Sequence, residues 1–408
     1  MNARRREDLP GSVLGWVLER SHDASARQVP ALIDQAAQRL GLAGTRLYVA
    51  DVQQVRLLAL PQLAAPRPGP AEATEADREA EALDIDGSLA GLAYRSQRTQ
   101  LSRDRTTAWL PMIDGVERIG VMKASGAALD EGDLEVCRAL AALATLMVVS
   151  KSAHNDPLVV RSRSRPMTLQ AELVWGFLPP RTIGTSQATS TAVLEPAYDI
   201  GGDAFDHNFS DDLLHLTLLD AMGHDLASGG ASAAGLAACR STRRSGGTLT
   251  EIAVTIERTL QQWIPDRLMT GILANLDTGH GDFTWVNCGH PAPLLIRNGH
   301  VLPGALERPA QLPLGLGFHA QEPPRQDRAR LQPGDRVLLY SDGVIEARSA
   351  AGELFGENRL ADTVIRSMAS GATAPEALRR LVLDLLTHQG QRLHDDATIV
   401  LSEWHPTT

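Results

Sequence analysis

Four aspartates at the ends of apolar strands constrain this chain more than any other feature of its sequence. Apolar runs predict strands at 213–219 and 337–340, and each run leads into an aspartate and a glycine-containing turn. A third aspartate follows the pair Gly201-Gly202, and a fourth begins a strand-like segment near the C-terminus. The four residues are Asp203, Asp220, Asp342 and Asp395. A fold that brings these strand ends to one edge would collect four carboxylates in one place.

Carboxylates at strand ends favour hard divalent cations. Mg²⁺ and Mn²⁺ prefer carboxylate and carbonyl oxygens, and strand ends hold such ligands rigidly. Two ions that share one carboxylate can activate a water molecule and neutralise a phosphoryl group during in-line attack. The sequence has no GxSxG serine elbow, no HExxH motif, no Cys/His zinc spacing and no GxxxxGK[ST] phosphate loop. This inventory favours metal-assisted hydrolysis without a covalent nucleophile.

Each aspartate taken alone has a simpler interpretation. Asp and Gly are standard turn-forming residues, so a single Asp-Gly at a strand end is more often a turn than a ligand. Four such positions are harder to explain together in this way, although spacing alone does not place them side by side. The pair Gly201-Gly202 adds a second signal, because glycine lets the backbone approach a ligand closely.

Composition and charge narrow the class of protein. The 408 residues suffice for two or three domains, and the fractions of 43% hydrophobic and 22% charged residues are typical of globular proteins. The net charge of −10 argues against an extended nucleic-acid surface. Three widely spaced cysteines fit a reducing compartment better than a disulfide framework. There is neither a membrane-spanning apolar run nor the apolar stretch of a signal peptide. We therefore expect a cytoplasmic protein with no nucleic-acid and no membrane partner.

The first 150 residues predict a small α+β domain. The expected elements are a helix at 30–40, a strand at 45–51, an exposed loop at 64–81, a helix at 87–95, strands at 108–113 and 116–122, and a helix from 130 to about 150. The segments GTRLYVAD, GSLAGLAYRSQRTQLSRD and LPMIDGVERIGVMKAS resemble a GAF domain, over about residues 10–150. The resemblance implies a sensory domain that binds a small ligand, senses redox state or light, or dimerises, and it does not select among these.

A linker and a short helix are expected between this domain and the next. The composition turns to Ser, Arg, His, Asn and Pro over 151–165. Leu169, Leu173 and Phe177 then recur every four residues up to a Pro-Pro pair, which predicts an amphipathic helix. This helix either couples the two domains or is only the first packed helix of the second. The predicted domains are a sensor at 1–150, a linker and coupling helix at 151–180, and a second domain at 181–408.

Six ordered motifs in the second domain carry a more specific resemblance. They are AYDIGGDAFD, LLDAMGHD, VNCGHPAPLLIRNG, LPLGL, LQPGDRVLLYSDGVIEAR and DDATIVL. The region from about residue 167 to 404, more than half of the chain, resembles the PPM (PP2C-like) serine/threonine phosphatases, in particular the bacterial SpoIIE/RsbU branch, whose members pair this domain with an N-terminal sensor. The resemblance implies an αββα sandwich of two antiparallel sheets. Helices predicted at 231–239 and 249–263 and strands at 268–276 and 283–288 fit that order.

The resemblance also implies a role for each aspartate. Asp220 would bridge two divalent metal ions, Mn²⁺ or Mg²⁺, and the backbone carbonyl of Ala221 would help to hold one of them. Asp203 would complete one metal site, and Asp342 and Asp395 would complete the other. Because all four carboxylates are present, a competent enzyme is the expectation.

One position departs from the family pattern. The family commonly shows Gly-His-Gly after the bridging aspartate, whereas this chain has Gly223-His224-Asp225, which puts the local geometry in doubt. His224 could donate a proton to the leaving serine or threonine oxygen, or it is a turn histidine that packs or hydrogen-bonds. We expect His290 to be structural and Asp396 to have a secondary, supporting role.

Together these features predict a metal-dependent protein serine/threonine phosphatase under the control of a GAF-like sensor. The resemblance implies that the substrate is a phosphorylated anti-anti-sigma factor of the STAS type, and the sensor with the coupling helix could form a homodimer. Two alternatives stay open. One is a pseudophosphatase that acts as a signalling scaffold without turnover, supported by Asp225. The other is a metal-dependent hydrolase of small phosphate esters or nucleotides.

Overall fold

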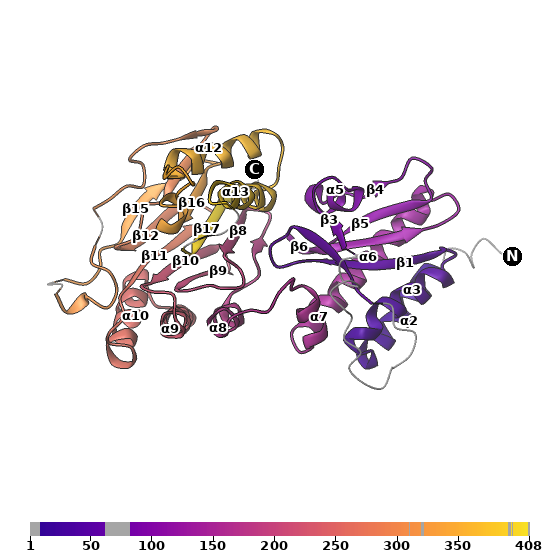
Figure 1. Ribbon diagram of the computed structural model, residues 1–408, viewed down its shortest axis with the longest axis horizontal. Helices are drawn as coiled ribbons and strands as arrows, with labels where there is room; N and C mark the ends of the chain where they lie inside the picture. The colour runs from indigo at the N-terminus through magenta and orange to yellow at the C-terminus, as the bar shows by residue number, and fades with distance from the viewer. Residues whose placement is uncertain are drawn as a thin grey trace. The chain divides into compact units, whose positions relative to one another are not determined.

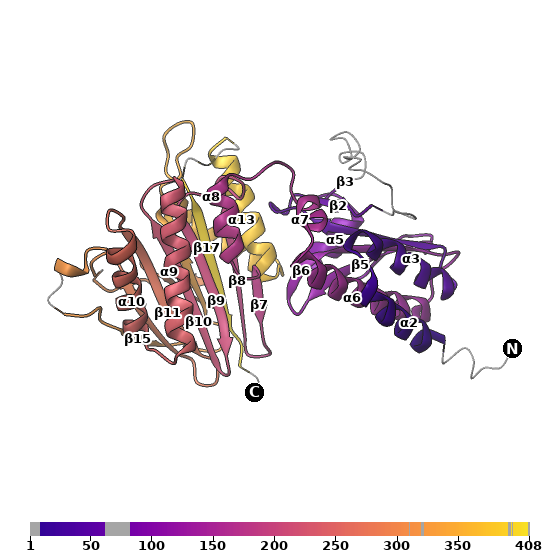
Figure 2. The same ribbon diagram turned by 90° about the horizontal axis from the view of Figure 1, so that it is seen from below.

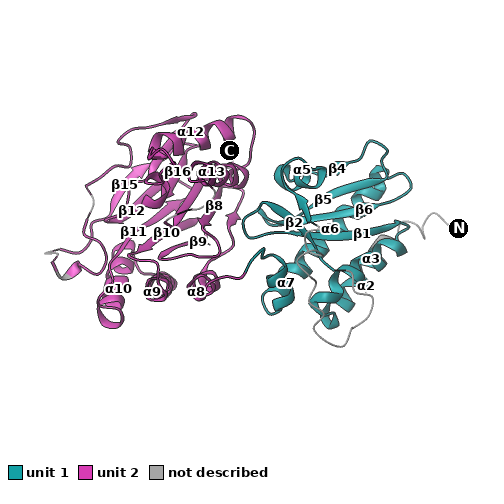
Figure 3. Ribbon diagram, viewed as in Figure 1, with its two compact units in different colours: residues 1–165 teal, residues 166–408 magenta. Residues whose placement is uncertain are grey.

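The chain divides into two compact units, residues 1–165 and 166–408 (Figure 3). The computed structural model describes residues 9–61, 82–309, 311–319, 322–390, 393 and 395–406. The loop expected at 64–81 lies outside these residues. Within the described ranges, no helix is both long enough and apolar enough to cross a membrane.

A six-stranded antiparallel sheet in the order β3-β2-β1-β6-β5-β4 forms the centre of the first unit. Its strands are β1 (Gly44–Ala50), β2 (Arg56–Ala59), β3 (Ala82–Asp84), β4 (Gln100–Leu101), β5 (Thr107–Asp114) and β6 (Glu117–Ser125). Its helices are α2 (Leu9–Asp23), η1 (Ala26–Gln28), α3 (Val29–Arg39), α5 (Leu89–Ser96), α6 (Glu131–Ser152) and α7 (Asp156–Arg161). The predicted helices, the first strand and the strand pair are confirmed to within a few residues.

Alternation along the strands gives this sheet two apolar faces. Leu47 and Val49 of β1 join the core that α2, α3 and α6 share, whereas Tyr48 between them joins the opposite cluster with Tyr94 of α5. Successive side chains of a strand point to opposite faces, so both faces need a covering helix. Figure 1 shows α5 on one side of the sheet and α2 and α3 on the other.

The segment expected as a linker is partly helical. Helix α6 runs to residue 152, and α7 follows it closely. The Nε atom of Arg161 in α7 donates a hydrogen bond of 2.7 Å to the carbonyl oxygen of Ala59 in β2, which fastens α7 to the first unit. Residues 151–165 therefore include a short packed helix, which the polar composition of this segment does not predict.

The second unit stacks two antiparallel sheets between layers of helices (Figure 1 and Figure 2). The first sheet has the order β15-β12-β11-β10-β9 and the second β14-β13-β16-β17-β8-β7. The strands are β7 (Thr182–Gly184), β8 (Ala188–Glu195), β9 (Asp203–Ser210), β10 (Leu213–Ala221), β11 (Met269–Asp277), β12 (Asp282–Cys288), β13 (Leu294–Arg297), β14 (His300–Val301), β15 (Asp327–Arg330), β16 (Arg336–Tyr340) and β17 (Ala397–Trp404). The helices are α8 (Leu169–Phe177), α9 (Leu226–Arg244), α10 (Leu249–Trp263), η2 (Gly317–His319), α11 (Asp342–Ile345), α12 (Gly356–Ala369) and α13 (Ala374–His388).

Helices cover the outer face of each sheet. Helices α9 and α10 pack on the first sheet, with α8 against α9, while α13 packs on the second sheet and α12 lies against α13. The αββα sandwich predicted for this part of the chain is confirmed. Helices α12 and α13 were not among the predicted elements.

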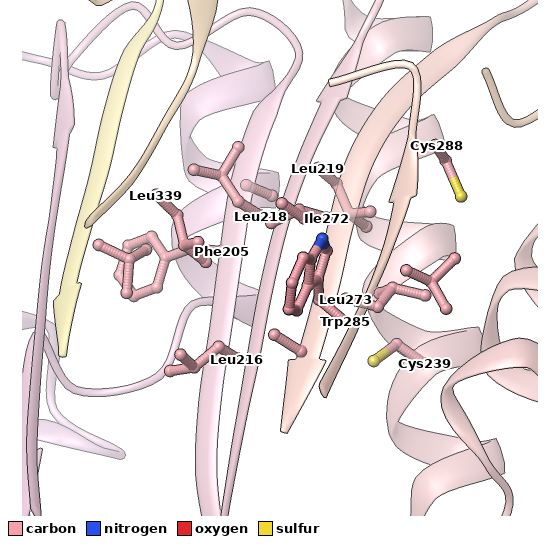
Figure 4. Close-up of a cluster of buried hydrophobic side chains, with 14 of the residues drawn as sticks. Phe205, Leu216, Leu218, Leu219, Cys239, Ile272, Leu273, Trp285, Cys288 and Leu339 are labelled. Atoms are coloured by element: carbon pink, nitrogen blue, oxygen red, sulfur yellow. The ribbon is translucent and has the colours of Figure 1, made fainter. Parts of the chain in front are cut away.

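The inner faces of the two sheets share one core. Phe205 of β9, Leu216 of β10 and Leu339 of β16 belong to the same buried cluster (Figure 4). His207, two residues after Phe205, lies 3.0 Å from the hydroxyl of Ser190 on β8, measured from Nδ1, which identifies the inward-facing positions of β9. The odd-numbered residues of β9 and the even-numbered residues of β10 therefore point into the sandwich.

Helix α8 has the predicted bounds but a different buried face. Leu169 is 66% exposed, whereas Ala171 and Val174 are fully buried. A Cβ atom on Gly229 of α9 would lie 3.5 Å from a methyl carbon of Val174. Leu169, one of the three apolar residues from which the amphipathic helix was predicted, is therefore not part of its buried face.

Two buried histidines lie on the first sheet of this unit. His215 of β10 is enclosed by polar neighbours, with Nδ1 2.9 Å from Oδ1 of Asn275 and Nε2 2.7 Å from the hydroxyl of Thr217. Burial lowers the pKa of His215 to about 4, and burial likewise lowers the pKa of His207 to about 4. Both imidazoles are therefore neutral at pH 7.

We predict that His215 weakens the second unit in mild acid. Its folded pKa of about 4 lies below the ordinary value of 6.5, so the unfolded chain binds the extra proton, and stability falls as the pH drops from 6.5 towards 4. The contribution reaches at most about 3 kcal/mol. Buried aspartates with raised pKa act in the opposite sense, so the measurement is the difference between wild type and H215Q in urea unfolding across this range. Parallel curves for the two proteins would contradict the prediction.

Candidate metal centre

Two of the four aspartates are cross-strand partners in one sheet. Asp203 begins β9, Asp220 lies near the end of β10, and the antiparallel register places them directly opposite each other. Both occupy inward-facing positions, because they continue the alternation of Phe205 and Leu218. Asp203 is almost completely buried, and Asp220 is partly exposed. The register alone therefore brings two carboxylates together at the inner edge of the first sheet.

The other two aspartates come from the second sheet. Asp342 is the first residue of α11, directly after β16, and Asp395 lies two residues before β17. Both are exposed. Gly343 allows these segments to touch, because a Cβ atom there would lie 2.0 Å from the carbonyl oxygen of Asp396 and 3.3 Å from Cβ of Asp395. The second sheet therefore presents its two carboxylates from adjacent backbone segments.

Like charges act on one another across the two sheets. Burial, followed by the charges of Asp342, Asp395 and Asp396, raises the pKa of Asp220 to about 7. Burial raises the pKa of Asp203 well above its usual range, and the negative charges of Asp220 and Asp396 add to this rise. The pKa of Asp342 is also raised, by burial and then by Asp395. The four predicted aspartates therefore share one electrostatic site in which a bound cation would be stabilised.

The donor chemistry of this site fits Mg²⁺ or Mn²⁺. Oδ2 of Asp203 is buried without a hydrogen-bond partner, which is costly unless a proton or a cation satisfies it. In the described part of the chain, no three His, Cys, Asp or Glu side chains stand close enough to hold a metal ion as they are placed.

Asp396 anchors the loop that carries Asp203. Its carboxylate accepts the N–H of Gly201 at 2.8 Å and the N–H of Asp203 at 3.0 Å. Burial raises the pKa of Asp396 to about 6, and these backbone hydrogen bonds oppose the rise. Asp396, for which a supporting role was expected, thus links the start of β17 to the start of β9.

Gly202 lets two backbone segments of the site meet. A Cβ atom on Gly202 would lie 1.9 Å from the carbonyl oxygen of Ala221. The carbonyl of Gly202 accepts the N–H of Ala221 at 3.1 Å and also the hydroxyl of Ser232 in α9. The glycine pair was predicted to allow a ligand close to the backbone, whereas the close approach in the structure is between two pieces of backbone.

The two histidines of the sequence motifs lie in different surroundings. His224 is exposed and lies against Gly201, where a Cβ atom would be 2.9 Å from Cβ of His224. It is therefore beside the loop of Asp203, and its role as proton donor stays a prediction. His290 is buried, its Nδ1 lies 2.8 Å from the hydroxyl of Thr270, and burial lowers its pKa to about 4, as expected for a structural residue.

Asp225 has a clear local function. It is the N-cap of α9, where its side chain accepts the N–H of Ser228 at 2.9 Å and its own N–H donates to the Ser228 hydroxyl. These hydrogen bonds, and then the neighbouring Arg267, lower the pKa of Asp225 to about 2. Aspartate is a preferred N-cap residue, so the departure from Gly-His-Gly is accommodated. Arg267 and Ser228 belong to the surroundings of the site, and the sequence motifs did not identify them.

Comparison with known proteins shows that the second unit is similar to known phosphatases. Residues 210–405 match the family model of stage II sporulation protein E (SpoIIE). The phosphoserine phosphatase RsbU of Bacillus subtilis is 24% identical over 211 residues, which are 52% of this chain and 61% of RsbU. Protein IcfG of Synechocystis sp. is 29% identical over 126 residues, 31% of this chain and 19% of IcfG. The matches thus span only part of either relative, and they show a similarity of the second unit to proteins of the SpoIIE/RsbU type.

Solved structures also resemble the second unit. The SiaA-PP2C domain of Pseudomonas aeruginosa is 20% identical, with coverage of 57% of this chain and 93% of that chain and a TM-score of 0.48.

We predict that Gly202→Ala destabilises the second unit by about 1–3 kcal/mol, because a methyl group cannot occupy the contact with Ala221 without moving β9 from β10. Gly230 of α9 is the matched control, since a Cβ atom there meets nothing within 4 Å. Gly230→Ala should leave stability unchanged or raise it by up to about 1 kcal/mol. Thermal unfolding measures both, and equal melting of the two variants would refute the proposed backbone contact.

Proposed function

We propose that this chain, which carries a SpoIIE-type phosphatase domain over residues 210–405, is a metal-dependent protein serine/threonine phosphatase. The observation that carries the proposal is that Asp220, which is paired with Asp203 in one sheet, lies within electrostatic reach of Asp342 and Asp395 from the other. These four residues are the proposed catalytic and metal-binding groups, joined by the backbone carbonyl of Ala221. No serine or cysteine nucleophile is required by this assignment.

The proposed mechanism divides the work between the cations and the protein. Two Mn²⁺ or Mg²⁺ ions would supply an activated water and the positive charge that stabilises phosphoryl transfer. Asp220, which faces inward from the first sheet, would serve both metal sites. Asp396 and Gly202 hold the backbone around it, so little reorganisation is needed during reaction. His224 at the exposed rim is the proposed proton donor to the leaving oxygen.

The substrate in this proposal is a phosphorylated regulatory protein, specifically an anti-anti-sigma factor of the STAS type. Two observations support a protein substrate: the relative RsbU is named a phosphoserine phosphatase, and Asp342, Asp395 and His224 are exposed, so a side chain of another protein can reach the site. Nucleic acid and membrane are not partners in this proposal, and its setting is the cytoplasm.

We propose that the first unit is a GAF-like sensor that controls the phosphatase, and that it forms a homodimer together with α8. Helix α8 supports this role because it packs on α9, whose N-cap Asp225 follows the candidate site by only a few residues, while Leu169 stays exposed. A signal in the sensor would act by favouring one of two states that differ in metal affinity.

The structure weakens the main alternative. A pseudophosphatase scaffold was suggested by Asp225, but this residue caps α9 and leaves the four carboxylates in place. Competition among a phosphoprotein, p-nitrophenyl phosphate and nucleotides separates the proposal from a small-ester hydrolase. A clear preference for nucleotides would favour that second alternative.

We predict that Asp220→Asn reduces phosphate release more than about 100-fold, because an amide cannot replace the carboxylate shared by two cations. The assay is release of phosphate from a phosphoserine STAS protein with Mn²⁺, and a chelator should abolish the wild-type reaction until Mn²⁺ is restored. The metal-free variant should melt at the same or a higher temperature, since one of several mutually repelling charges is gone.

Asp282→Asn is the matched control for this variant. Asp282 lies at the opposite end of the same sheet, in an exposed pair with Arg330. The control should keep wild-type turnover. Unchanged turnover in Asp220→Asn would contradict the role assigned to Asp220.

A further inference from the structure

We propose that Arg267 is a positioning residue of the candidate metal centre, which acts with Asp225 to hold the turn Met222–His224 behind Asp220 and Ala221. This inference rests on the proposed function, because it assigns the pair a task at the same site. Arg267 lies in the segment between α10 and β11, outside all six sequence motifs.

One guanidinium spans both ends of the turn. Nη1 of Arg267 donates a hydrogen bond of 3.1 Å to the carbonyl oxygen of Met222, and Nη2 bonds the carboxylate of Asp225. The planar guanidinium fork suits such a two-point contact, whereas the ammonium of lysine is a single point charge. The turn between these two points contains Gly223 and His224.

The turn is shaped to receive this side chain. Gly223 has φ +100°, and a Cβ atom there would lie 2.8 Å from Nη1 of Arg267. Glycine therefore serves twice, because it adopts the left-handed backbone and leaves room for the guanidinium. The N–H of Met222 also donates to the carbonyl of Leu268 at 2.9 Å, so the segment around Arg267 holds the turn by backbone and side chain together.

Arg267 is itself well supported. Its N–H donates to the carbonyl of Ile264 at 3.2 Å, and a Cβ atom on Gly315 would lie 2.7 Å from its carbonyl oxygen. Its side chain is 23% exposed, while that of Asp225 is 54% exposed. The ion pair is therefore partly screened by solvent and should add little to global stability. Its effect should be local, on the backbone that presents Ala221.

The position of the turn explains why that local effect matters. Asp220 and Ala221 directly precede it, and Asp225 directly begins α9. If the turn moved, the carbonyl of Ala221 would move with it. Groups that orient metal ligands without touching the metal typically change metal affinity or activity by about 10–100-fold when they are removed.

The test compares Mn²⁺ binding to the metal-free full-length protein, by titration calorimetry, for wild type and the variants R267A, R267K and D225N. R267A should bind Mn²⁺ about 10-fold more weakly. R267K should rescue only part of the loss, because one ammonium cannot hold both Met222 and Asp225. D225N keeps a good N-cap residue but loses the charge, so it separates the ion pair from helix capping, and it should weaken binding less than R267A.

Enzyme kinetics provide a second measurement, which would not change in the same way if Arg267 had a purely structural role. At saturating Mn²⁺, R267A should recover most of its turnover, with an unchanged KM for the phosphoprotein. A raised KM with unchanged Mn²⁺ affinity would overturn the inference and indicate substrate contact instead. In the double variant D225N/R267A the losses should not add, because the two side chains act as one unit.

Arg330→Ala is the matched control, since Arg330 and Asp282 form an exposed pair at the far end of the same sheet. It should bind Mn²⁺ like wild type. If R267A also binds like wild type while wild type releases phosphate, the inference fails and the phosphatase proposal stands. If wild type binds Mn²⁺ but releases no phosphate from any phosphoprotein, the phosphatase proposal fails, and weaker binding by R267A would still support Arg267 as a positioning residue.

Discussion

Repulsion between carboxylates that the fold forces together is the interaction on which the second unit depends. The register of β9 and β10 fixes Asp203 opposite Asp220, and burial leaves both with raised pKa values. Asp396, a further buried carboxylate beside them, accepts hydrogen bonds from neighbouring backbone N–H groups. What remains is a concentrated negative site for which a divalent cation is the natural counter-charge.

Close backbone contact, more than side-chain packing, keeps these charges in place. Gly202 and Gly343 each occupy a position where a Cβ atom would lie about 2 Å from a carbonyl oxygen of another segment. The hydroxyl of Ser232 in α9 holds the carbonyl of Gly202, so the helix layer also fixes the loop of Asp203. Arg267 serves the loop after Asp220 in a comparable way. The loop before Asp203 and the loop after Asp220 are therefore each held by residues that lie outside the strand carrying the aspartate.

The sequence predicts the strands and the turns that follow them, because alternation and turn residues are local signals. The convergence of the strand ends was implied only by the resemblance to a known family. It does not predict the contacts of Asp396 with Gly201 or of Arg267 with Met222, since these partners are far apart in the chain and no periodicity links them. Nor do the spacings of Leu169, Leu173 and Phe177 predict that Ala171 and Val174 are the fully buried residues of α8. Local sequence patterns thus identify the candidate aspartates, and tertiary contacts determine how their backbone segments are held.

The site consists of a fixed half and an adjustable half. Asp203 and Asp396 are buried, and the carboxylate of Asp396 is bound to backbone N–H groups, whereas Asp342 and Asp395 are exposed. In the proposed metal centre both halves would hold the cations, so a small displacement of either loop would change cation affinity without a change of fold. The proposed control by the first unit needs such a difference between two states.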